Sequence, residues 1–193
     1  MIVSLARRRP QKVALEAATL ARLAPGRFIL GVGMGMPVDF TRFGEDDGWR
    51  VRADKIETSL ALLRRLWAGE DVGGPDAPVR FFEEPLPPIP VWVSGEWPRR
   101  QPFHGASLAD GVFPIVPSGD DRLFAPPAVD ILRDCLASLP DRARRDCALW
   151  SFGDRGDVSL DEYEAAGVTW WMGDTSGLAY DEVVSLVAAG PPR

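Results

Sequence analysis

The sequence predicts an α/β fold with a parallel sheet, arranged as an incomplete (β/α)8 barrel. Short apolar runs alternate with segments whose apolar residues recur at helical spacing, which is typical of βαβ units. We count five full strands and one stub, each followed by a helix, in 193 residues. A closed barrel needs eight strands and typically about 250 residues. Residues 1–193 are therefore expected to form a single domain that lacks roughly two βα units.

The expected strands are short apolar runs bounded by glycine, proline or helical segments. Residues 28–32 are apolar throughout and end in glycines, as a parallel strand covered on both faces does. Residues 91–93 follow an extended proline-rich approach, and residues 79–82 form a further short strand in an interval that breaks the alternation. In chain order we expect neighbouring parallel strands at 2–5, 28–32, 91–93, 111–116, 148–152 and 168–172.

The expected helices carry apolar residues on one face. Pro10 suits the first turn of a helix, and apolar residues then recur at helical spacing as far as Ala21. A second helix extends from Ala53 to Trp67, where Gly69 ends it. Further helices are expected through 106–109 and at about 128–139, 160–166 and 180–189.

Composition is that of a soluble globular protein, with 46% hydrophobic and 26% charged residues. No apolar run approaches the roughly 18 residues that span a membrane, and the first twelve residues do not form a signal peptide. A net charge of −6 argues against a nucleic-acid surface as the main function. Cys135 and Cys147 have no zinc-binding or CxxC spacing, so we expect a cytoplasmic protein.

His104 is the single histidine of the chain. A histidine-rich metal site is therefore excluded, and we expect no metal. A Ser-His-Asp triad would need His104, and no G-x-S-x-G elbow accompanies it. We expect His104 in or beside a helix on the outside of the barrel, far from the carboxyl ends of the strands.

Four segments carry motifs of a known family, in the family's order. Residues 9–35 are similar to R-x-P…A-x-x-x-A-T-L…G-R-x-x-L-G-V-G-x-G, and residues 52–67 to R-x-x-x-x-E…L-W. Residues 88–111 resemble P-P-I-P-V-x-V-x-G…A-D-G, and residues 162–169 give a weaker match to Y-x-x-A-G-V-T. Together they resemble the bacterial-luciferase-like family of flavin- or deazaflavin-dependent oxidoreductases.

The resemblance implies a TIM-type barrel with an isoalloxazine-type ring at the carboxyl ends of the strands. The cofactor would be FMN, with monooxygenase chemistry, or the deazaflavin coenzyme F420 (F-420), with hydride transfer to or from a small organic substrate. It also implies that the family's first two βα units and most of its third strand are missing. The chain is then an enzyme, a non-catalytic flavin-binding or oligomerising remnant, or a fragment of a longer enzyme with a misassigned start.

Four residues are the candidates for contact with the cofactor. Gly33 and Gly35 follow one expected strand, and Ser94 and Gly95 end another, so all four face one mouth of the barrel. Glycine there lets backbone amides approach a ring or phosphate, although a tight strand exit explains the same glycines. The spacing G-x-G-x-G, followed by Pro37, argues against a dinucleotide site. No catalytic residue is assigned, because Met36 cannot donate a proton and Asp39 is displaced from the family's position.

Other candidates have simpler explanations. Arg99 and Arg100 are suited to a phosphate but are expected on the solvated surface. Arg52 and Glu57 are expected to serve helix packing and charge pairing. The candidates for ring stacking are Trp92, Trp97, Trp170 and Trp171, although tryptophans in strands more often lie in the core.

The same shortage of strands predicts two unpaired sheet edges, at 2–5 and 168–172. An exposed strand edge is a template for pairing with another chain. We therefore expect a homodimer or a soluble aggregate and not a monomer.

Overall fold

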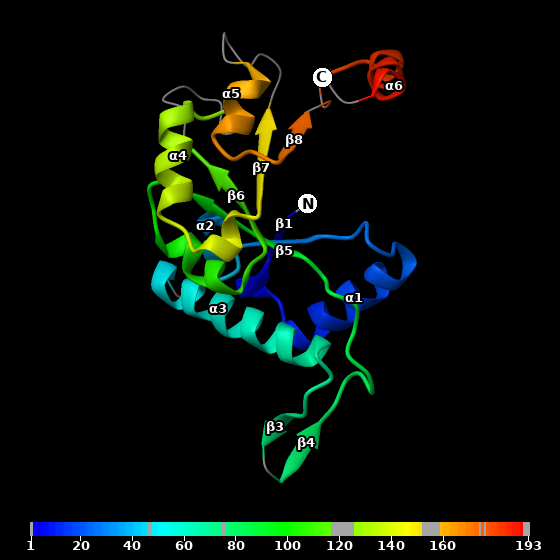
Figure 1. Cartoon of the computed structure of the whole chain (residues 1–193). Coiled ribbons are helices and arrows are strands. Elements are labelled where there is room, and N and C mark those ends of the chain that lie inside the picture. Colours follow the sequence, from blue (N-terminus) through cyan, green and yellow to red (C-terminus); the bar gives the residue numbers. More distant parts are fainter. Residues whose placement is uncertain are drawn as a thin grey trace.

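The computed structural model describes residues 2–45, 48–74, 76–116, 126–151, 159–173, 175 and 177–190. A six-stranded sheet dominates this part of the chain (Figure 1), and all of its neighbouring strands are parallel. The strands follow one another in the sheet as they do along the chain, which confirms the predicted order. In sequence they are β1 (Ile2–Ser4), β2 (Leu30–Gly33), β5 (Val91–Glu96), β6 (Gly111–Ile115), β7 (Asp146–Ser151) and β8 (Trp170–Gly173).

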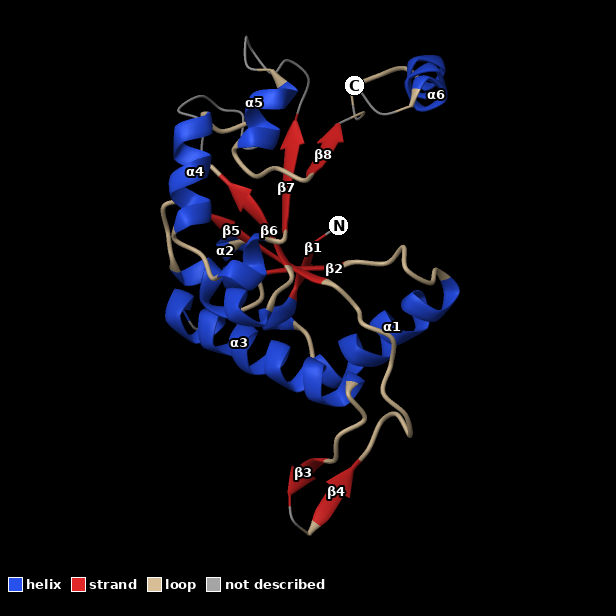
Figure 2. Ribbon diagram, viewed as in Figure 1, coloured by secondary structure: helices blue, strands red, loops and turns tan. Residues whose placement is uncertain are grey.

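Helices cover the outer face of this sheet (Figure 2). The α-helices are α1 (Pro10–Leu23), α2 (Pro37–Arg42), α3 (Gly48–Trp67), α4 (Val129–Ala137), α5 (Leu160–Ala165) and α6 (Tyr180–Ala189). The described residues also include three 3₁₀ helices, η1 (Leu5–Arg7), η2 (Gln101–Leu108) and η3 (Asp141–Arg144). The Trp67 indole donates a 3.1 Å hydrogen bond to the Ala14 carbonyl, which joins α3 to α1. The fold is therefore the predicted incomplete barrel of βα units.

Successive strand residues face opposite sides of the sheet, as the strand period of two requires. Val91, Val93 and Val112 pack into the main core beneath the helices. Trp92 and Phe113 belong to a second, smaller core cluster on the other side of the sheet. We call that second side the inner face, because it corresponds to the interior of a closed barrel.

Three local predictions need correction. Residues 79–82 are not a strand of their own, because β4 (Ala77–Val79) pairs antiparallel with β3 (Val72–Gly74) in a hairpin. Gly73 allows this turn with φ of +105°, a value that side chains disfavour. The helix expected through 106–109 is the longer 3₁₀ helix η2, and the short helix α2 was not expected at all. Phe152, the expected end of one strand, lies outside the described residues.

The two ends of the sheet are open. Strands β1 and β8 each pair on one side only within the described sheet, at the two edges that the sequence predicts. Helix α6 follows β8 and lies apart from the other helices (Figure 1), and it has no buried residue. Within the described residues, no helix is both long enough and apolar enough to cross a membrane.

Candidate functional site

The candidate site lies at the carboxyl ends of the strands, which meet at one edge of a parallel sheet. We call this edge the mouth. It comprises the ends of the strands together with η1, α2, the first turn of α3 and the segment that follows β5. This end of a (β/α)8 barrel carries the active site in characterised enzymes of the fold.

Gly33 and Ser94 lie side by side at the mouth, on the inner face. A Cβ on Gly33 would lie 3.0 Å from Ile2 Cγ2 and 3.7 Å from Ser94 Cβ. Gly33 therefore lets the side chains of β1 and β5 approach each other across β2. The Ser94 side chain is buried there. The structure thus brings these two predicted residues together.

Gly35 lies next to β1 at the same edge. Its φ of +80° favours glycine, and a Cβ would lie 3.0 Å from both Ser4 Cβ and the Phe40 ring. The Ser4 hydroxyl donates a 3.4 Å hydrogen bond to the Met34 carbonyl. A strained turn and close packing within the chain therefore explain this glycine directly.

Gly95 does not share the inner face with Ser94. It is the next residue along β5, so its missing side chain points toward the helices. A Cβ there would lie 2.5 Å from Pro102 Cβ and 3.0 Å from the Phe103 ring. Gly95 thus allows η2 to pack on β5, and its backbone lies in the β5–β6 ladder, in register with Pro114.

The inner face offers an apolar wall below the mouth. Phe113 and Trp150 meet edge to face, with ring centroids 6.4 Å apart. Ile115 and Met172 pack against the same cluster. This wall suits one face of a flat aromatic ring, because aromatic and apolar side chains supply most of the lining of cofactor sites.

The four tryptophans predicted as stacking candidates serve packing, whereas Trp150 was not among them. Trp97 is half-buried and packs against the main core. Trp171 lies on the helix side of β8, with its ring centroid 5.3 Å from that of Tyr163. Trp92 and Trp170 lie on the inner face but near the amino ends of their strands, where both indoles donate to Asp146. Neither reaches the mouth.

Sequence reasoning missed an alternating series of arginines and aromatic rings at the mouth. We call it the arginine–aromatic stack. In order, it consists of Phe43, Arg7, Phe40, Arg52, Trp49 and Arg99. Arg52 lies at its centre, with its guanidinium carbon 4.4 Å from the Phe40 centroid and 4.6 Å from that of Trp49. Arg52 is buried, at 2% exposure, which confirms its expected packing role.

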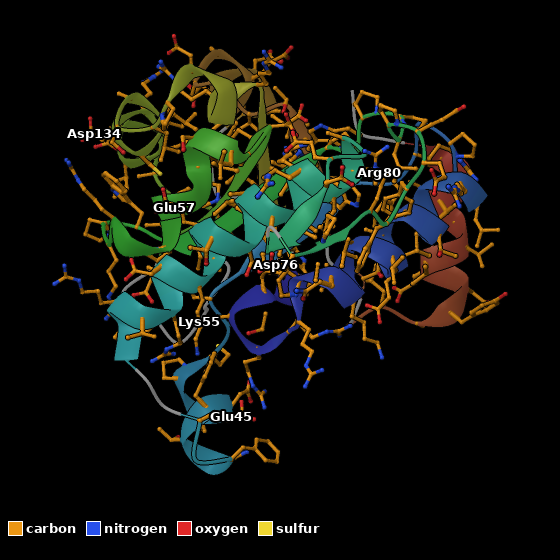
Figure 3. All side chains as sticks on the ribbon, turned by 90° about the horizontal axis from the view of Figure 1, so that it is seen from below. Glu45, Lys55, Glu57, Asp76, Arg80 and Asp134 are labelled. Atoms are coloured by element: carbon orange, nitrogen blue, oxygen red, sulfur yellow. The ribbon has the colours of Figure 1, made fainter. Side chains whose placement is uncertain are left out.

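Acidic side chains flank both ends of this stack. Glu45, on the segment between α2 and α3 (Figure 3), accepts a 2.7 Å hydrogen bond from Arg7 Nε. This hydrogen bond raises the pKa of Arg7 above its usual value, so Arg7 stays charged. Arg99 is exposed, as expected. Its Nη1 lies 3.6 Å from Glu96 Oε2, and its guanidinium stacks on Trp49.

The remaining candidates are not members of the stack, and the side chain of one of them is not described. Arg100 is exposed, and so is Glu57, which lies on α3 (Figure 3). Asp39 lies half-buried in the first turn of α2, close enough to favour the charge on Arg7. His104 belongs to η2, and its side chain is outside the described part of the structure.

The mouth therefore fits one side of a ring-binding site. Ser94 supplies a hydroxyl, residues 33–35 supply backbone groups, and the inner face supplies an apolar wall. Ile2, Ser4 and Pro102 already pack closely against the three glycines. Their lack of a side chain is therefore explained by packing within the chain and does not by itself indicate a ligand cavity.

Fold and site together define an α/β protein of the parallel-barrel class with its candidate site at the mouth. The chain belongs to the luciferase-like monooxygenase family, whose family model matches residues 1–123. An F420-dependent glucose-6-phosphate dehydrogenase of Beutenbergia cavernae is 36% identical over 187 aligned residues, covering 82% of this chain and 53% of that protein. A phthiodiolone/phenolphthiodiolone dimycocerosates ketoreductase of Mycobacterium tuberculosis is 34% identical over 158 aligned residues, covering 74% of this chain and 41% of that protein.

Solved structures share the fold at lower identity. An F420-dependent secondary alcohol dehydrogenase in complex with an F420–acetone adduct superposes with a TM-score of 0.58 and 15% identity, covering 86% of this chain and 69% of that one. The FMN complex of the oxygenating constituent of 3,6-diketocamphane monooxygenase from Pseudomonas putida superposes with a TM-score of 0.53 and 18% identity. The superposition covers 79% of this chain and 47% of that one. The chain spans about half the length, or less, of the curated relatives described above.

Proposed function

We propose that this chain binds the deazaflavin coenzyme F420 at the mouth, as the cofactor-binding part of an oxidoreductase that acts on a small organic substrate. The observation that carries the proposal is the contact of Gly33 with Ser94 on the inner face, at the ends of β2 and β5. Both segments carry the family's motifs, and relatives at 34–36% identity include proteins named as F420-dependent or as ketoreductases.

The chain's own residues have three tasks in this proposal. The Ser94 hydroxyl and the backbone groups of residues 33–35 hold polar atoms of the coenzyme. Phe113, Trp150 and Met172 cover one face of the ring and exclude water from it. When bound, the coenzyme supplies hydride transfer.

FMN with monooxygenase chemistry is the second cofactor choice. A solved structural neighbour binds FMN, and its likeness to this chain supports the shared fold. Both rings are flat and similar in size, so the apolar wall accepts either. Relatives named as F420-dependent are the reason that we place F420 first.

A non-catalytic binding or oligomerising role is the alternative. The open edges at β1 and β8 in the described sheet favour it. In this case the mouth lacks one wall, and a second copy of the chain covers the edges as a homodimer. Both cysteines are buried and free, which is consistent with the cytoplasmic location that we propose.

Titration of the purified chain with F420 and with FMN, followed by ring fluorescence, tests the proposal. Because one wall is absent, we expect F420 to bind more weakly than in a complete barrel, between micromolar and millimolar Kd. Ser94→Ala should weaken binding about tenfold, the factor that corresponds to 1.4 kcal/mol. Ser59→Ala is the matched control, since Ser59 is a buried serine of α3 away from the mouth. Absence of binding of either ring at millimolar concentration would overturn the proposal.

A further inference from the structure

A continuous line of contacts connects Gly35 to the first turn of α3. The Phe40 ring lies where a Cβ on Gly35 would meet it at 3.0 Å. On its other side the Arg52 guanidinium packs against Phe40, with its carbon 4.4 Å from the ring centroid. Arg52 in turn stacks on Trp49 at 4.6 Å. Backbone 33–35, α2 and α3 are therefore joined through one arginine.

The same arginine lies at the centre of a larger assembly. The guanidinium carbon of Arg7, in η1, lies 5.5 Å from the Phe40 ring centroid and 5.3 Å from that of Phe43. The guanidinium carbon of Arg99, which follows β5, lies 5.4 Å from the Trp49 centroid. These residues belong to the segments that leave β1, β2 and β5. The arginine–aromatic stack thus links the exits of three neighbouring strands at the mouth.

Burial makes the central contact the strongest of the series. Arg52 is only 2% exposed, whereas the side chains of Arg7 and Arg99 are 26% and 52% exposed. Cation–π contacts gain most when water is removed from both partners. Arg52 Nε also donates a 3.3 Å hydrogen bond to the Gly48 carbonyl, which restrains the guanidinium beside the two rings.

We propose that Arg52 is a positioning residue for the cofactor site: through Phe40, it holds α2 and the backbone of residues 33–35 in the conformation that receives the ring. This inference rests on the proposed function for its ligand. The holding of α2 is a property of the chain alone. A planar, delocalised guanidinium stacks on aromatic rings, and neither the ammonium of lysine nor the thioether of methionine offers such a plane.

Hydrogen exchange, followed by mass spectrometry on the whole chain without ligand, tests the holding of α2. In Arg52→Lys and Arg52→Met, amides of residues 34–43 should exchange about tenfold faster than in the wild type, since α2 then opens locally. Amides of α1 and α4 should change less. Phe40→Leu, which removes the ring and keeps an apolar side chain, should reproduce the effect.

Leu63→Ala is the control variant, because Leu63 is a fully buried residue of the same helix that takes no part in the stack. It should speed exchange throughout the core and not selectively at residues 34–43. Equal acceleration at 34–43 and in α1 for the Arg52 variants would overturn the proposal, as would an unchanged rate at 34–43.

The link to the ring is tested by titrating the same variants with F420. Arg52→Lys should raise Kd about tenfold. Arg65→Ala, at an exposed arginine in the last turn of the same helix, should leave Kd within about twofold. If wild type and variants bind F420 equally, Arg52 does not position the site. If the wild type binds no ring, the proposed function fails, and hydrogen exchange still decides whether Arg52 holds α2.

Discussion

The Trp92 indole reaches across strand β6 and donates a 3.0 Å hydrogen bond to the carboxylate of Asp146 on β7. Gly111 of β6 is in register with both residues and makes this crossing possible. A Cβ on Gly111 would lie 2.5 Å from the Trp92 ring and 2.6 Å from Asp146 Cβ. The second carboxylate oxygen of Asp146 accepts a 3.3 Å hydrogen bond from Trp170. Three side chains thus tie β5, β7 and β8 together at the amino ends of the strands.

Replacement of Gly111 tests this crossing. Gly111→Ala should lower the free energy of unfolding by about 2–3 kcal/mol, because the methyl group forces the indole off the carboxylate and overpacks the sheet. Urea denaturation followed by circular dichroism measures the change. Gly74→Ala is the control, since a Cβ on Gly74 meets nothing within 4 Å. Equal stability of the two variants would contradict the role assigned to Gly111.

Asp110 connects the start of β6 to α3 and β5. Its carboxylate accepts hydrogen bonds from Arg64 Nη2 at 2.5 Å and from the Val91 amide at 3.0 Å. Asp110→Ala should destabilise the fold by about 2–3 kcal/mol, because it leaves a half-buried guanidinium without its carboxylate. Asp110→Asn should cost less, since the amide oxygen still accepts from Val91. Chemical denaturation of both variants measures the difference, and a larger loss for Asn would contradict this account.

The sheet order could be predicted because each strand is a short apolar run and each pair is joined by a helical segment. Gly33 and Ser94 could be placed at the mouth for the same reason. The sequence does not show which side of the sheet Gly95 faces, because it does not show which face Ser94 occupies. The packing of Pro102 against Gly95 settles this in the structure. The hairpin β3–β4 has little apolar pattern of its own. The sequence therefore indicated only a break in the alternation of strands and helices at this point.

The arginine–aromatic stack was beyond sequence reasoning for a different reason. Its members are separated by up to 92 positions, from Arg7 to Arg99. Their contacts depend on how the segments that follow three strands come together in space. The hydrophobic periodicity of the sequence carries no information about this arrangement. The only local signal was the spacing of Trp49 and Arg52, which places both side chains on one face of a helix.

The buried thiols make stability sensitive to alkaline pH. Burial raises the pKa of Cys135 and of Cys147 to about 12, against 9.0 for an ordinary thiol. Above pH 9 the unfolded chain therefore releases protons that the folded chain retains, so the free energy of unfolding falls as pH rises. Below pH 9 these thiols are protonated in both states and their contribution is constant.

Urea denaturation at pH 8, 9 and 10 measures this slope. Each thiol should contribute a loss approaching about 1.4 kcal/mol per pH unit above its unfolded pKa. A Cys135→Ala/Cys147→Ala variant starts from lower stability but should show a flatter dependence on pH. An identical slope in the variant would mean that other groups govern the alkaline loss; Tyr163, whose pKa burial also raises, is the first of these to test.

Helix α6 should contribute little to the stability of the sheet domain. It has no buried residue, and Tyr180 and Val187 are 81% and 72% exposed. A ten-residue helix without packing is marginal in water, so its amides should exchange nearly as fast as those of an unfolded chain. Truncation after Gly173 should change the free energy of unfolding by less than about 0.5 kcal/mol. A larger loss would show that α6 packs on the sheet in solution.

The open edge at β1 should mediate association between copies of the chain. Strand β1 pairs only with β2 in the described sheet, and Ile2 is 37% exposed at this edge. Unpaired strand edges recruit further strands, and a charged side chain on the edge suppresses such pairing. The wild type should therefore sediment as a dimer at tens of micromolar, and Ile2→Lys should shift it toward monomer. Val79→Lys is the matched control, because Val79 is similarly exposed but lies in the hairpin β3–β4, away from both sheet edges. Sedimentation equilibrium of the three proteins decides the question: a wild-type monomer, or equal dissociation by both lysines, would remove β1 as the interface.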